Sequence, residues 1–169
     1  MEALDTLKQL INGELAAAIQ YKIAAESLVG SDNFDYIKSH CEEHYEEEFE
    51  HYQLLVTALM QREGSADLEI QSAVSDALPA TEELESADTG YIKNFFIRTE
   101  DNAIEAYLNF HETIKDSDPD LDDIILGIID DEREHKLDFT RLEGVQPTLE
   151  SFKNKQRANK ILREMLARK

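Results

Sequence analysis

Apolar residues recur every three or four positions along most of this chain, with almost no strand-like alternation. Four long segments carry this helical period, and each ends at a glycine or a turn-forming stretch. The segments run over about residues 4–28, 31–62, 88–115 and 121–143. The pattern therefore predicts four helices.

The connections between these segments differ in length. Short turns join the first two segments and the last two, whereas residues 65–87 form a connection too long for a simple up-down bundle. We therefore expect an all-α fold, a four-helix bundle of two hairpins joined by a long crossover. Pro147 and Thr148 open a short fifth helix. We divide the chain into a bundle over residues 1–145 and a basic amphipathic helix over residues 146–169.

The chain is strongly acidic, and its charge is uneven. Its 169 residues carry a formal charge of −20, yet residues 151–169 alone hold seven Lys or Arg against one Glu. An acidic surface argues against a nucleic-acid partner and suits a protein that attracts cations. The apolar stripe of the basic tail favours docking on the bundle or on a neighbouring subunit of a homo-oligomer. The alternative is an anchor to another partner.

The sequence also bears on location. No stretch approaches eighteen consecutive apolar residues, and MEALDTLKQL lacks the layout of a signal peptide. Cys41 is the single cysteine, which excludes an intramolecular disulfide and any metal site built from cysteines alone. We expect a cytoplasmic protein without a membrane partner, in which Cys41 is a small core residue.

Each predicted helix places one glutamate within its apolar stripe, and two helices add a histidine three residues later. The set comprises Glu14, Glu48 with His51, Glu100, and Glu132 with His135. On the second helix, steps of three or four residues from His51 reach Leu54, Leu55 and Ala58. We expect these side chains to face the centre of the bundle.

Buried carboxylates need partners. An unpaired one costs several kcal/mol or takes up a proton, and four facing one another would be worse. Two divalent metal ions would balance four carboxylates, and two neutral imidazoles would complete the ligands. Oxygen and nitrogen donors without a thiolate suit iron or manganese better than structural zinc. Bundles that hold two iron or two manganese ions use this combination of residues.

The positions repeat within the chain. Glu48 and Glu132 are 84 residues apart, as are His51 and His135, while EFEH (48–51) matches EREH (132–135). ELAAAIQY (14–21) and EDNAIEAY (100–107) each place a tyrosine seven residues after the glutamate. The sequence therefore predicts a duplicated helical hairpin and a metal site with approximate two-fold symmetry.

These motifs resemble the ferritin-like superfamily, and most closely its bacterioferritin branch. GELAAAIQY, EFEHYQLL, RTEDNAIEAY and DEREHKLDF are similar to the family's ligand motifs on successive helices. The resemblance implies a centre with two Fe per chain (Mn is possible), where O₂ or H₂O₂ oxidises Fe²⁺. Glu14, Glu48 and His51 would serve one ion, and Glu100, Glu132 and His135 the other, with Glu48 and Glu132 bridging them.

The chain departs from the family's pattern in three places. Phe49 occupies the position of the methionine that ligates haem, so we predict no haem. The longer crossover and the basic tail mean that a 24-subunit cage does not follow from the motifs. Ala103 occupies the place of a further carboxylate in the rubrerythrin pattern, and no CxxC pair exists, which weakens a rubrerythrin-type peroxidase.

Several neighbouring residues have two interpretations. His44 could gate metal entry or be a buried histidine bonded to a neighbour. Glu47 resembles an inner-surface acid that could pass iron onward, or it is a solvated glutamate. Tyr21 and Tyr107 are core aromatics that could also hydrogen-bond to the ligands or take part in redox chemistry. The remaining histidines, His40 and His111, we expect at the surface or at the ends of the bundle.

Three functions are compatible with this sequence. The first is a ferroxidase for iron storage or detoxification. The second is a non-storing oxidase or peroxidase that uses the same site. The third is a non-enzymatic assembly protein. The native metal, the oxidant and the oligomeric state are left open by the sequence.

Overall fold

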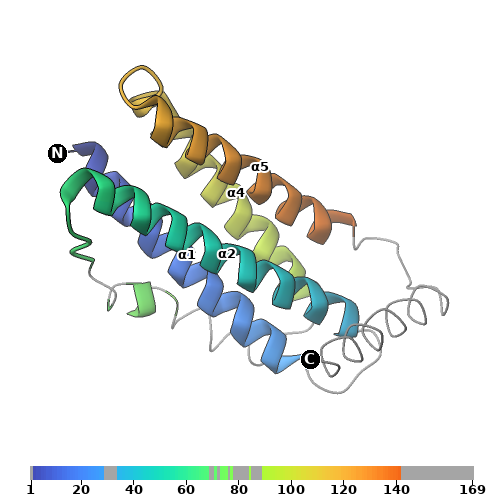
Figure 1. Cartoon of the computed structure of the whole chain (residues 1–169). Helices are drawn as coiled ribbons and strands as arrows, with labels where there is room; N and C mark the ends of the chain where they lie inside the picture. The colour runs from blue at the N-terminus through green and yellow to red at the C-terminus, as the bar shows by residue number, and fades with distance from the viewer. Residues whose placement is uncertain are drawn as a thin grey trace, which may run out of the picture.

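The computed structural model describes residues 2–28, 34–68 and 89–141, together with positions 71, 73–75, 77 and 84. Four long helices account for most of these residues (Figure 1). They are α1 (Glu2–Ser27), α2 (Phe34–Glu63), α4 (Thr89–Ile114) and α5 (Pro119–Arg141). No strand occurs in the described part of the chain. The predicted all-α four-helix bundle with a long crossover is confirmed. The predicted tail helix, and with it the boundary at residue 145, lies outside the described residues.

The helix ends follow local signals. Gly64 has a φ of 76° and donates its N–H to the Met60 carbonyl oxygen at 2.8 Å, which closes α2 in the left-handed conformation that glycine adopts readily. The DSDPD stretch was expected to precede the last helix, but α5 already begins at Pro119. Proline suits the first helical position because the N–H it lacks would have no partner there. Asp118 accepts a hydrogen bond from the Leu121 N–H at 3.2 Å and caps the helix.

Asp118 also joins the two hairpins. Its carboxylate accepts hydrogen bonds from Arg62 Nε at 2.6 Å and Nη2 at 2.7 Å. The Arg62 guanidinium holds the pKa of Asp118 below its usual value. We expect Asp118→Ala to lower the free energy of unfolding by about 1–2 kcal/mol, because the cap and the ion pair are both lost. Asp118→Asn keeps a capping oxygen and should lose less than half as much. Urea unfolding of the metal-free protein measures both, and equal losses would contradict the capping role.

The helices pack as two hairpins, α1 with α2 and α4 with α5, which Figure 1 shows as a blue-to-green pair and a yellow-to-orange pair. Across the hairpins, α1 packs on α4 and α2 packs on α5. Tyr21 contacts Glu100 while Glu14 contacts Tyr107, so α1 and α4 are antiparallel. The connection over residues 64–88 therefore returns the chain to the other end of the bundle, and α2 and α4 run in the same direction.

Two apolar clusters fill the bundle, one toward each end. The first includes Leu7, Ile11, Leu55, Leu59, Phe110, Ile125 and Ile128. The second includes Tyr21, Ala24, Ile37, Cys41, Ile92, Phe96 and Phe139. Buried polar and charged side chains lie between them: Glu14, His44, Glu48, His51, Glu100, Glu132 and His135. The bundle thus surrounds a charged layer with apolar packing.

One side chain expected in the centre faces outward. Leu54 is 44% exposed, whereas Leu55 is fully buried and Ala58 is 1% exposed. Successive residues of an α-helix are about 100° apart, so Leu54 lies about 100° from the middle of the buried face of α2. Stepping by three from His51 was too coarse to show this. None of the described helices is both long and apolar enough to cross a membrane.

Candidate metal centre

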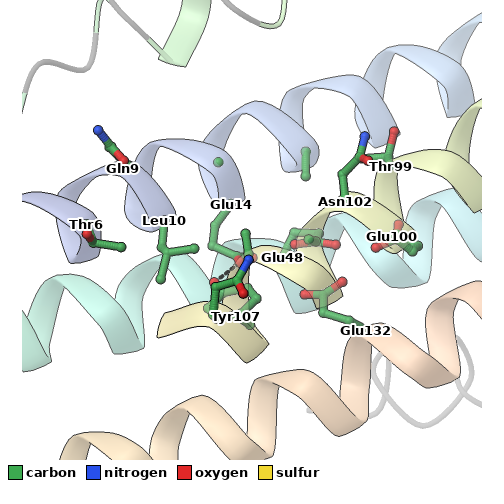
Figure 2. Close-up of a pocket in the computed structure, with 15 residues that line it drawn as sticks. Thr6, Gln9, Leu10, Glu14, Glu48, Thr99, Glu100, Asn102, Tyr107 and Glu132 are labelled. Atoms are coloured by element: carbon green, nitrogen blue, oxygen red, sulfur yellow. Dashed lines mark hydrogen bonds between the residues drawn. The ribbon is translucent and has the colours of Figure 1, made fainter. Parts of the chain in front are cut away.

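The six residues singled out in the sequence converge in the charged layer. Each is at most 6% exposed. One carboxylate comes from each helix, and both imidazoles come from α2 and α5. Figure 2 shows Glu14, Glu48, Glu100 and Glu132 directed toward one another between the helices. The duplicated motifs therefore meet at one place.

Two overlapping sets of four residues could each hold a metal ion. The first set is Glu14, Glu48, His51 and Glu132, and the second is Glu48, Glu100, Glu132 and His135. Within each set the donor atoms lie within 4.8 Å of one another. Glu48 and Glu132 belong to both sets, so they lie where bridging carboxylates would be placed.

The two histidines approach the shared carboxylates with the same nitrogen. Nδ1 of His51 lies 3.3 Å from Glu132 Oε1, and Nδ1 of His135 lies 3.3 Å from Glu48 Oε1. The outer nitrogens are held by other carboxylates, since Nε2 of His51 lies 3.2 Å from Asp131 Oδ2 and Nε2 of His135 lies 2.9 Å from Glu47 Oε2. An ionised carboxylate only accepts hydrogen bonds, so each Nε2 carries the proton. Once the ring is neutral, Nδ1 is free to bind a metal.

Asp131 was not identified from the sequence. It directly precedes Glu132, as Glu47 directly precedes Glu48, and the same offset of 84 residues relates the two pairs. Applying the duplication one residue further would have found it. Glu47, left undecided between two interpretations, is half exposed and bonds to both His135 and His44. Hydrogen bonds from His135 and then His44 lower its pKa to about 2.

Substitution of Asp131 tests whether its carboxylate orients the imidazole ring of His51. We expect Asp131→Asn to weaken metal binding by about 10- to 100-fold at the set that contains His51, because the amide no longer fixes the ring with a charged acceptor. Asp130→Asn is the matched control, since Asp130 is an exposed neighbour outside both sets. Anaerobic calorimetric titration with Mn²⁺ measures the two affinities separately. Equal affinities in the two variants would show that Asp131 does not orient His51.

Two tyrosines complete the charged layer. The Tyr21 hydroxyl donates to Glu100, and the Tyr107 hydroxyl donates to Glu14. Each bond crosses from one hairpin to the other, so the pair repeats the two-fold arrangement of the carboxylates. Burial, followed by the charge of the carboxylate each one contacts, raises the pKa of both phenols well above 10.0. The tyrosines are therefore neutral donors that orient Glu14 and Glu100.

The four carboxyl groups differ in their affinity for protons. Burial raises the pKa of Glu14 and Glu100 well above its ordinary value, and the charges of Glu48 and Glu132 add to the effect. Burial also opposes ionisation of Glu48 and Glu132, but the imidazoles of the two histidines outweigh it and lower their pKa. The shared carboxylates are thus ionised in the metal-free protein, and the outer pair hold protons more tightly.

The histidines have the opposite shift. Burial lowers the pKa of His51 and His135, but the surrounding carboxylates outweigh it and raise both above the ordinary value of 6.5. Two imidazolium ions therefore balance two carboxylates when no metal is bound. Two divalent ions would balance four carboxylates equally well after the protons leave.

Several buried atoms in this layer that could bind a metal have no hydrogen-bond partner. They are Glu14 Oε2, Glu48 Oε1, His51 Nδ1, both Glu132 carboxylate oxygens and His135 Nδ1. Buried polar atoms are normally paired, so this concentration calls for a ligand. Carboxylate oxygen and imidazole nitrogen suit Fe²⁺ or Mn²⁺. The residues therefore fit a pair of such ions.

Two pockets lead to the charged layer from opposite faces. A cavity of about 460 Å³ lies between α1 and α4 and reaches all four carboxylates. Small residues border it, namely Gly13, Ala17, Ala103 and Ala106. A pocket of about 250 Å³ lies between α2 and α5 and reaches His135 and Glu47. Small molecules and ions can approach the centre from either face.

A bundle of this topology, with carboxylate and histidine ligands at its middle, is the architecture of ferritin-like proteins. The chain belongs to that family, since the family model Ferritin, described as the ferritin-like domain, matches residues 4–144. The resemblance read from the motifs is thereby confirmed. A solved structure of similar fold is the dodecameric thioferritin of Bacteroides fragilis, described as a bacterioferritin-related protein. It is 24% identical, has a TM-score of 0.69, and the match covers 83% of each chain. No curated protein matched.

Proposed function

We propose that this protein is a ferroxidase of the ferritin-like family, which binds two Fe²⁺ ions per chain and oxidises them with O₂ or H₂O₂. One observation carries the proposal. Buried oxygen and nitrogen atoms without hydrogen-bond partners belong to two ligand sets that overlap at Glu48 and Glu132. Both sets use only carboxylate oxygen and imidazole nitrogen. Iron is the substrate of this reaction, and Mn²⁺ is the alternative ion.

The residues of the site have different roles in this reaction. Glu48 and Glu132 belong to both ligand sets and would be shared by the two ions, whereas Glu14 and Glu100 would each bind one of them. Two Fe²⁺ ions together supply the two electrons that reduce O₂ to H₂O₂, or H₂O₂ to two water molecules, and either reaction takes up two protons. The cavity between α1 and α4 gives the oxidant access to the carboxylates. The tyrosine hydroxyls keep Glu14 and Glu100 in place while charge changes between them.

Storage is the second part of the proposal, and it needs an enclosed assembly. The similar thioferritin is dodecameric. On α2 of this chain, Phe49, Leu54 and Met60 are 40%, 44% and 50% exposed, and Phe49 stacks near Tyr45 and Tyr52. Exposed apolar side chains of this kind, here on both flanks of α2, can support contacts between subunits. We therefore propose a cytoplasmic homo-oligomer, without haem, that keeps oxidised iron inside.

Oxygen uptake tests the reaction. Addition of two Fe²⁺ per chain to the metal-free protein is expected to consume about one O₂ per two iron ions, at least tenfold faster than the same iron in buffer. An oxygen electrode gives both the rate and the ratio. With H₂O₂ as the oxidant, the absorption of the ferric product gives the rate instead. Iron oxidation no faster than in buffer with both oxidants would reject the ferroxidase.

Molecular mass tests storage. Light scattering on an iron-loaded sample is expected to show a large assembly. Iron analysis of the same sample is expected to show many more than two iron ions per chain. A monomer or dimer, or retention of only two ions per chain, would reject storage. Oxidation without retention would favour the non-storing oxidase, and neither oxidation nor retention would favour an assembly protein.

A further inference from the structure

A third group of possible metal ligands lies between α2 and α5, next to the two ligand sets around Glu48 and Glu132. It consists of His40, His44 and Asp138, whose donor atoms lie within 4.8 Å of one another. Asp138 Oδ2 is 3.5 Å from Nδ1 of His40 and 3.9 Å from Nε2 of His44. The side chains are 12%, 4% and 25% exposed in the order given. None of the three belongs to the two sets around Glu48 and Glu132.

Three of the four imidazole nitrogens in this group lack hydrogen-bond partners. Both ring nitrogens of His40 and Nε2 of His44 are buried without a hydrogen bond. The distances to Asp138 are too long for hydrogen bonds but leave room for an ion between the three side chains. His40 was expected at the surface or at an end of the bundle. It instead packs its ring against Tyr36, at 4.6 Å between ring centres, and close to His44, at 5.7 Å.

His44 is oriented as a metal-binding histidine is. Its Nδ1 lies 3.1 Å from Glu47 Oε2, and because a carboxylate accepts, Nδ1 carries the proton. In the neutral ring this leaves the lone pair on Nε2, the atom that faces Asp138. A carboxylate that holds one nitrogen while the other binds the ion is the usual arrangement around metal-bound histidine. The same arrangement holds His135 and His51 in the charged layer.

We propose that His40, His44 and Asp138 bind a third divalent cation, separate from the pair and next to it. Two imidazoles and one carboxylate leave positions open for water, which suits an exchangeable Fe²⁺ ion rather than a permanently held one. The pocket of about 250 Å³ between α2 and α5 reaches His44 and Asp138, so the ion enters from that face. Glu43 and Glu134 also line this pocket and add negative charge to it.

The third site connects to the pair through Glu47, and this step rests on the proposed function. His44, Glu47 and His135 form a further group whose donor atoms lie within 4.8 Å of one another. The rings of His44 and His135 are 4.1 Å apart between centres, and Glu47 Oε2 contacts both. The third site and the group around Glu47 therefore share His44, and the group around Glu47 shares His135 with the second ligand set of the pair. A cation can move from the third site to the pair by exchanging ligands a few at a time.

Cobalt binding tests the site independently of any redox reaction. In full-length Glu48→Gln/Glu132→Gln protein, which lacks the shared carboxylates, anaerobic titration with Co²⁺ is expected to show one remaining site by its visible absorption. Adding Asp138→Asn or His40→Ala should weaken that site at least tenfold. Adding His111→Ala should not, because His111 pairs with Asp122 at 2.6 Å outside every metal group. Circular dichroism checks that each variant is folded.

Two outcomes would overturn the third site. One is the absence of Co²⁺ binding when the shared carboxylates are replaced. The other is binding that neither Asp138→Asn nor His40→Ala weakens, which would leave His40 and His44 as packing residues. Failure of Fe²⁺ oxidation by both O₂ and H₂O₂, with Co²⁺ binding retained, would reject the ferroxidase while the site stands, so the two proposals fail separately.

Kinetics tests the link to the pair. In the otherwise unchanged protein, His40→Ala is expected to slow oxidation at one Fe²⁺ per chain by about tenfold, with the final number of ions bound by the pair unchanged. Stopped-flow absorption follows the rate, and His111→Ala is again the control. An unchanged rate in His40→Ala would show that iron reaches the pair by another route.

Discussion

Replacing Glu48 and Glu132 together by glutamine is expected to abolish tight binding of both metal ions of the proposed pair. Each of these carboxylates belongs to both ligand sets, so neither ion keeps a full set of charged donors. Loss of a directly bound carboxylate should exceed the 10- to 100-fold loss that follows when a residue supporting a ligand is changed, so we expect about 100-fold or more per ion. Anaerobic Fe²⁺ titration by calorimetry, with iron measured on the same sample, gives affinity and number of sites.

The control must match the change in charge. Glu46→Gln with Glu50→Gln removes the same two charges from exposed positions on α2. This variant should bind two ions per chain at the pair with unchanged affinity. Two tight sites surviving in Glu48→Gln/Glu132→Gln would refute the pair as placed here. A single surviving site that is lost on Asp138→Asn is instead the third site.

Loading of the pair is expected to release about four protons at pH values below the raised pKa of the outer carboxyls. Burial makes Glu14 and Glu100 hold protons, and the surrounding carboxylates make His51 and His135 hold them. All four must be unprotonated to bind metal. Each step of one pH unit downward should therefore lower the overall binding constant for two ions by about four orders of magnitude.

The direction of this effect follows from the direction of the shifts. A raised pKa means that protons compete with metal over a wider range of pH, so affinity rises with pH. As the pH passes above the raised pKa of Glu14 and Glu100, the release should fall toward the two protons of the histidines. A pH indicator in weakly buffered solution counts the protons during anaerobic Mn²⁺ titration. Affinity that is independent of pH would show that the metal-free layer is not protonated as described.

Much of the fold could be predicted because helical periodicity and helix ends are local properties. The glycine at position 64 ended α2 as expected, and the long connection before α4 indicated the crossover. The beginning of α5 was less predictable. It depends on the Asp118 carboxylate, which caps α5 and binds Arg62 of the other hairpin. A contact between residues 56 positions apart cannot be read from local pattern.

The site shows the same division. The six residues at its centre could be singled out because a glutamate within an apolar stripe is unusual, and because the two halves of the chain repeat. The hydrogen-bond partners were harder to predict, since an exposed acid such as Asp131 resembles any other solvated residue in this acidic chain. Its role appears only when α2 and α5 are side by side. Glu47 illustrates this too, because its contact with His135 joins positions 88 residues apart.

The sequence by itself determined the helices, their pairing into hairpins and the residues of the charged layer, because each depends on the periodicity and repetition of side chains along one element. The tertiary structure decided which nitrogen of each histidine faces inward, which carboxylates hold the outer nitrogens, and that His40, His44 and Asp138 meet. Those properties depend on the rotation and register of one helix against another. Small rotations decide whether a residue is buried, as Leu54 and Leu55 show, and they set the distances at which ligands can converge.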